Sequence, residues 1–68
     1  MIPAARSPLT LAEIRRADAA AELERARQTV RELGALAGTP ELRRVIAAEA
    51  AYDTATADVR RLTQAGAA

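Results

Sequence analysis

The 68-residue sequence contains no cysteine, histidine, lysine or asparagine, and its only aromatic side chain is Tyr52. Without cysteine or histidine the chain lacks the groups that form disulfides and most structural zinc sites. Domains of this size usually gain stability from a disulfide, a metal or oligomerisation. The composition therefore favours association with another chain.

Residues that perform catalysis are equally scarce. Nucleophilic catalysis needs an activated Ser, Cys, Thr or Lys beside a base, and the lone serine, Ser7, lies near the N-terminus. Glu22, Glu49 and Asp53 are the carboxylates that two packed helices would bring together, but metal sites in helical bundles add histidines. We interpret these three as a solvated acidic belt. We predict a protein that is not an enzyme, with no catalytic residue, metal or cofactor.

Long apolar runs are also missing. No stretch resembles a signal peptide or reaches the roughly 18 apolar residues of a membrane span, so we expect a cytoplasmic protein with no membrane partner. The formal net charge of +1 argues against a dedicated polyanion binder. Half of the residues count as hydrophobic, but most of these are alanine, which favours helices that approach one another closely.

The spacing of apolar residues predicts a helix over about 40–64. They recur at alternating steps of three and four, which places them on one helix face. This face comprises Val45, Ala48, Tyr52, Ala55, Val59 and Leu62. Thr39 is the expected N-cap and Pro40 the first helical residue. Residues 65–68 are expected to form a flexible tail.

An earlier helix is predicted over about 11–33. Thr10 and Glu13 have the spacing of a capping box, and Leu9 can pack on Ile14 as a hydrophobic staple. The apolar face runs through Ala12, Arg16, Ala19, Leu23, Ala26, Val30 and Leu33. Gly34 is placed to cap the C-terminus. Residues 1–8 are expected to be a flexible arm, and residues 34–39 a turn.

A turn this short makes the two helices antiparallel neighbours. Counting outward from it pairs Leu33 with Leu42, Val30 with Val45, Ala26 with Ala48, Leu23 with Tyr52, and Ala19 with Ala55. We therefore predict an all-α fold, a coiled-coil-like helical hairpin spanning residues 9–66. Its core residues are Leu23, Val30, Leu33, Val45, Tyr52, Val59 and Leu62.

Other apolar residues lie outside this core and predict a second interface. They are Ile14, Leu42, Ile46, Ala50 and Ala57. The small side chains of Ala50 and Ala57 would let another helix approach, so that two hairpins combine into a four-helix bundle. An alternative interpretation treats the alanines as helix filler, but Ile46 is a large β-branched residue and favours an interface.

Arginines gather at both ends of the predicted hairpin. The possible phosphate contacts are Arg31, Arg43, Arg44, Arg60 and Arg61. Against phosphate binding, several arginines follow an acidic residue at i+3, including Arg25 after Glu22 and Arg61 after Asp58, a spacing that stabilises single helices. No nucleic-acid recognition motif or set of stacking aromatics accompanies them.

These observations predict a non-enzymatic helical interaction protein, such as an assembly, adaptor or regulatory subunit. Its partner would be itself, with a dimer favoured, or another helical protein, and binding would use apolar helix contacts. The alternative is a small nucleic-acid-binding regulator that uses the arginines. A third hypothesis is a structural component of a larger particle such as a phage or secretion assembly. The small size of the chain fits this hypothesis, but no particular residue points to it.

Overall fold

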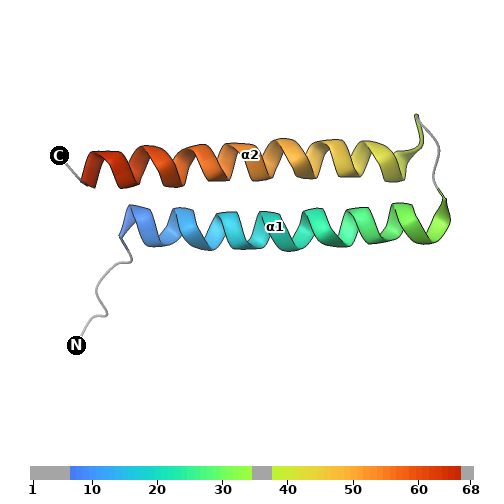
Figure 1. The fold of residues 1–68 in the computed structure, drawn as a ribbon, viewed down its shortest axis with the longest axis horizontal. Helices are drawn as coiled ribbons and strands as arrows, with labels where there is room; N and C mark the ends of the chain where they lie inside the picture. The colour runs from blue at the N-terminus through green and yellow to red at the C-terminus, as the bar shows by residue number, and fades with distance from the viewer. Residues whose placement is uncertain (1–6, 35–37, 67–68) are drawn as a thin grey trace.

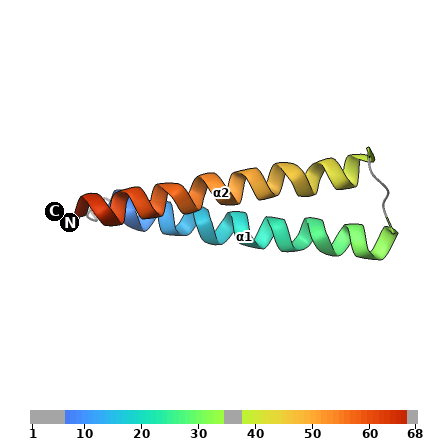
Figure 2. The same cartoon turned by 45° about the horizontal axis from the view of Figure 1, so that its top comes forward.

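The hairpin consists of two antiparallel helices. The computed structural model describes residues 7–34 and 38–66, and these contain no strand. Helix α1 (Pro8–Leu33) has 26 residues and α2 (Pro40–Gly66) has 27. The helices lie side by side, with the start of α1 and the end of α2 at the same end of the molecule (Figure 1). The predicted all-α helical hairpin is confirmed, and a view turned by 45° shows the same pair (Figure 2).

The start of α1 differs from the prediction. Its N-cap is Ser7, whose Oγ accepts a hydrogen bond from the backbone N–H of Thr10 at 3.1 Å, and Pro8 begins the helix. Thr10 is therefore inside the first turn and is not the N-cap. A proline is well suited to this first position, because its fixed φ is already helical and its missing N–H would have no helical partner. Starting at Ser7 thus adds three helical residues to the predicted range.

The two ends of the predicted turn match the expectation, and its residues 35–37 lie outside the described residues. Gly34 has a left-handed φ of 61°, and its N–H donates to the Val30 carbonyl, as a C-terminal cap should. Thr39 Oγ1 accepts from the backbone N–H of Leu42 at 3.4 Å, so Thr39 and Pro40 start α2 as predicted. Helix α2 extends two residues beyond its predicted end. Of the predicted arm and tail, residues 1–6 and 67–68 lie outside the described residues.

The core lies where the two predicted faces meet. Leu23, Ala26, Val45 and Ala48 form one buried cluster, hereafter the core cluster. Ala26 is fully buried, and the small side chains at Ala26 and Ala48 let the helices approach closely. Val30 and Tyr52 pack against this cluster and are partly buried. The register deduced from the apolar spacing therefore matches the structure at the centre of the hairpin.

Toward the open end the helix contact is made by buried alanines and by larger side chains that are only half-buried. Ala12 and Ala55 are buried there, and Val59 and Leu62 are half-buried. The buried apolar side chains larger than alanine, Leu23 and Val45, both lie in the half of the hairpin nearer the turn. Burial scales with apolar area, so we infer that the core cluster contributes most of the stability.

Leu33 is a correction to the predicted core. Its side chain is 64% exposed and so does not bury against Leu42. Because Leu33 is the last residue of α1, no later turn of that helix supports it against α2.

Neither helix of the described chain is both long and apolar enough to cross a membrane. Each is about 40 Å long at 1.5 Å per residue, but charged side chains recur along both.

Candidate protein interface

One exposed face of α2 carries the largest apolar side chain that is left exposed on that helix. Ile46 is 60% exposed, and Ala50 and Ala57 on the same face are exposed as well. Leu42 is half-buried at the edge of this face, beside the turn. Four of the five residues of the predicted interface therefore lie along one helix.

Ile14 does not join them. It is 36% exposed and belongs to the first half of α1, near the open end, whereas Ile46 is close to the turn. Leu11, 40% exposed, is the other large apolar side chain exposed near the start of α1. The predicted interface is therefore two separate places on the hairpin, of which the α2 face is the longer.

Polar side chains connect the helices on one side of the hairpin. Glu22 accepts hydrogen bonds from Arg44 of α2 at 2.8 Å and from Arg25 of its own helix at 3.1 Å. The Arg44 hydrogen bond, followed by that of Arg25, lowers the pKa of the Glu22 carboxyl from its ordinary value. Glu22 therefore stays ionised at neutral pH and ties α1 to α2 beside the core cluster.

The predicted acidic belt is not assembled as one group. Glu22 pairs with Arg44, while Asp53 lies with Glu24, Arg27 and Glu49 around a hollow of about 390 Å³ beside Tyr52. The helical positions explain this separation, because Glu22 and Asp53 flank the core on opposite sides. Within residues 7–34 and 38–66, no three acidic side chains come close enough to hold a metal ion.

Three of the arginines proposed to bind phosphate have carboxylate partners. Arg31 contacts Glu24 at 3.0 Å, Arg44 contacts Glu22, and Arg61 contacts Asp58 at 3.2 Å. The Glu22–Arg25 and Asp58–Arg61 pairs have the predicted i,i+3 spacing. Arg44 instead reaches across to α1, although Glu41 lies three residues before it in sequence.

The remaining two, Arg43 and Arg60, form no ion pair in the part of the chain that the structure describes. Both are exposed on α2. They lie toward opposite ends of that helix, about 25 Å apart at 1.5 Å per residue, and so do not form one basic patch.

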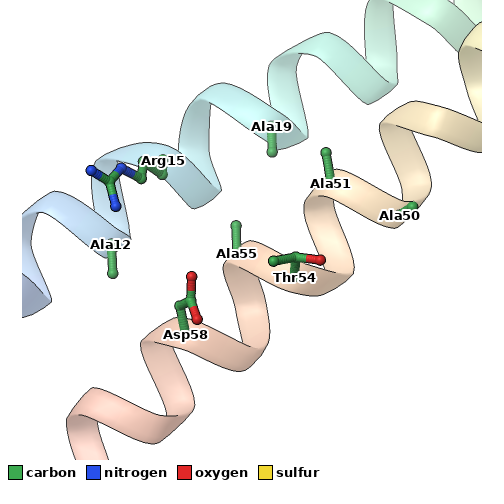
Figure 3. Close-up of a pocket in the computed structure, with 8 residues that line it drawn as sticks. All are labelled: Ala12, Arg15, Ala19, Ala50, Ala51, Thr54, Ala55 and Asp58. Atoms are coloured by element: carbon green, nitrogen blue, oxygen red, sulfur yellow. The ribbon is translucent and has the colours of Figure 1, made fainter.

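A shallow groove runs along the open half of the hairpin, with a volume of about 430 Å³. Figure 3 shows the side chains of Ala51 and Ala55 directed toward α1 and those of Ala12 and Ala19 directed toward α2. Ala50 of the predicted interface also lines this groove, and Arg15 and Asp58 carry its charges. We did not predict it, although four alanines at facing positions, with no larger side chain to fill the space, are a signal for it.

No protein-family model, curated protein or solved structure gives a significant match to this chain.

Proposed function

We propose that this protein is a non-enzymatic helical interaction module that binds a second helix, its own or that of another protein, along the outer face of α2. The observation that carries the proposal is the exposure of Ile46, at 60%, in line with exposed Ala50 and Ala57. Full burial of a side chain of this size contributes a free energy of about 1.5 to 3 kcal/mol. An isolated hairpin does not gain this stabilisation at the exposed part of Ile46.

The alanines on this face support the same function. A helix presents a methyl group at each alanine, so a partner helix can approach closely and pack its larger side chains between the methyl groups. Ile46 provides the one large anchor, and Leu42 widens the apolar surface at the turn end. Interfaces of this type concentrate their binding energy in a few such anchors.

The charges of the chain favour protein over nucleic acid as the partner. Arg31, Arg44 and Arg61 already contact carboxylates, so phosphate would have to compete for them. Binding through apolar contacts persists or strengthens as salt rises, whereas phosphate binding weakens steeply. Salt dependence therefore separates the proposed function from the nucleic-acid alternative.

The test compares two single substitutions at matched exposed positions. Ile46→Glu places a charge on the proposed face, and Leu33→Glu places one at a side chain of similar exposure, 64% against 60%, on the other helix. Light scattering across a dilution series, at low and high salt, measures association. We expect wild type and Leu33→Glu to associate equally at both salt concentrations and Ile46→Glu to associate less.

Equal association of all three proteins would contradict the proposed face. Tight binding to a labelled single-stranded or duplex oligonucleotide that is lost at high salt would support the nucleic-acid regulator instead. Far-UV circular dichroism of each variant checks that the helices remain, since both substitutions lie at exposed sites and should leave the hairpin folded.

A further inference from the structure

One stripe on the outer face of α2 has the spacing of a coiled-coil seam. Its residues follow one another at alternating steps of three and four, and all five are exposed. We call them the outer stripe: Arg43, Ile46, Ala50, Asp53 and Ala57. The seam with α1 lies on another side of the same helix, and Ala50 and Asp53 border the hollows that flank that seam.

The charges at positions 43 and 53 are not used within the hairpin. Neither Arg43 nor Asp53 forms an ion pair in residues 7–34 and 38–66, whereas the neighbouring Arg44 pairs with Glu22. The two residues lie on either side of Ile46 and Ala50 in the outer stripe. Along the stripe the side chains are basic, large, small and acidic in turn. If a second copy of the stripe runs in the opposite direction, each basic residue faces an acidic one and each large residue faces a small one.

We propose that a second copy of this chain covers the outer stripe. Its α2 runs antiparallel to the first, and a two-fold axis crosses the contact at the level of residue 48. Arg43 of each copy then faces Asp53 of the other, and Ile46 of each packs on Ala50 of the other. The proposal rests on the function proposed above and names the partner of the same face. Residues 39–57 overlap, and the remainder of α2 projects beyond the contact.

The other arrangements of two α2 helices are less favourable. A parallel pair would place each residue beside its own copy, so Arg43 would face Arg43 and Asp53 would face Asp53. An antiparallel pair shifted by one heptad would bring Arg43 opposite Arg60. Like charges facing each other across a seam disfavour a pairing, and such repulsion is how coiled coils select orientation and register.

The favoured register has one unfavourable contact, which provides an independent check. It brings Glu49 of the two copies close together on the same side of the seam, next to the two-fold axis, where their carboxylates repel. Replacing Glu49 with glutamine removes this repulsion, and we expect Glu49→Gln to dimerise more tightly than wild type. The parallel pair keeps the same two residues at flanking positions far from each other across the seam, so it predicts no such gain.

The decisive experiment uses two charge reversals, Arg43→Glu and Asp53→Arg, in the full chain. Each alone creates two like-charge contacts in the symmetric dimer, and we expect its dissociation constant to rise at least about tenfold. Mixed in equal amounts, the two variants are complementary at both contacts, so the mixture should associate about as tightly as wild type. Sedimentation equilibrium on each protein and on the mixture measures these constants.

Arg60→Glu is the matched control. It makes the same charge change on the same helix but lies outside the overlap, and it should leave dimerisation unchanged. In the register shifted by one heptad it would instead strengthen the dimer, because it would relieve the contact with Arg43. Circular dichroism of every variant verifies that the hairpin is intact.

The results separate this inference from the proposed function. A mixture that associates no better than its two components, or a wild-type chain that is monomeric at millimolar concentration, would overturn the antiparallel dimer. If Ile46→Glu abolishes association while the charge reversals do not affect it, the face is correct and the register is wrong. If neither kind of substitution affects association, both the face and the register are wrong.

Discussion

Arg44 of α2 contacts a single carboxylate oxygen of Glu22 on α1 twice, through Nε at 2.8 Å and through a terminal guanidinium nitrogen at 2.7 Å. This is the one ion pair between the two helices among the residues that the structure describes. It lies beside the core cluster, so it aligns the helices where their apolar side chains interlock. Its strength depends on the ionisation of Glu22.

The pH dependence of unfolding should report this pair. The arginines lower the folded-state pKa of Glu22 below 4.5, so the unfolded chain binds this proton more readily. The stabilisation is therefore complete above a pH of about 4.5 and is lost as the pH falls through the folded-state pKa. We expect the Tm of wild type to exceed that of Glu22→Gln at neutral pH, and the difference to disappear in strong acid.

Melting curves followed by circular dichroism at a series of pH values measure this difference. Glu13→Gln is the control, because it removes the same charge from α1 at a site with no ion pair within residues 7–34 and 38–66. A Tm difference between wild type and Glu22→Gln that is constant with pH would show that the carboxylate charge is not what stabilises the contact.

Truncating the core cluster should be costly. Leu23 is 8% exposed and lies among Ala26, Val45 and Ala48, so Leu23→Ala should lower the free energy of unfolding by about 2 to 5 kcal/mol. Leu33→Ala removes the same atoms from a side chain that is 64% exposed and should have little effect. Urea unfolding of the two variants tests this contrast, and equal losses would mean that Leu33 is buried in solution.

Enlarging an alanine at the helix contact should also destabilise the hairpin. Ala26 is fully buried, so Ala26→Leu must push the helices apart or force strained rotamers, at a cost of about 1 to 3 kcal/mol. Ala17→Leu makes the same change at an exposed position of α1 and should be nearly neutral. Thermal melts of both variants provide the comparison. A stabilised Ala26→Leu would indicate a cavity at this contact.

The first turn of α1 offers a fourth test. Ser7 Oγ accepts from the Thr10 N–H, so Ser7→Ala should cost about 0.5 to 2 kcal/mol through loss of the N-cap. Thr10→Ala keeps that backbone hydrogen bond and should cost less. If Thr10→Ala proves the more damaging change in thermal melts, the helix begins at Thr10 in solution.

The hairpin and its central register follow from apolar spacing alone. Leu23 and Tyr52 were matched by counting from the turn, and both lie at the core cluster. This succeeded because an antiparallel pair with a short turn has few alternative registers. The exposure of Leu33 could not be deduced in this way, since a seam pattern takes no account of where the helix that carries the residue ends.

Local polar contacts were harder to predict. Thr10 with Glu13 and Ser7 with Pro8 are both acceptable helix starts, and the longer helix is the one that forms. Arg44 had an acidic neighbour on its own helix, yet it contacts Glu22. A long charged side chain has several possible partners within reach. Which one it contacts depends on the side of the helix pair to which the side chain points.

The start of α1 and the end of α2 lie at the same end of the rod (Figure 1), and this has a mechanical consequence. A force that pulls these two ends apart acts across the helix contact and not along it. Under such a force the alanine contacts around Ala12 and Ala55 should open first, and the side chains of the core cluster should separate last. We therefore expect the hairpin to open one layer at a time under low force, whereas helices pulled from opposite ends would resist with all their contacts together.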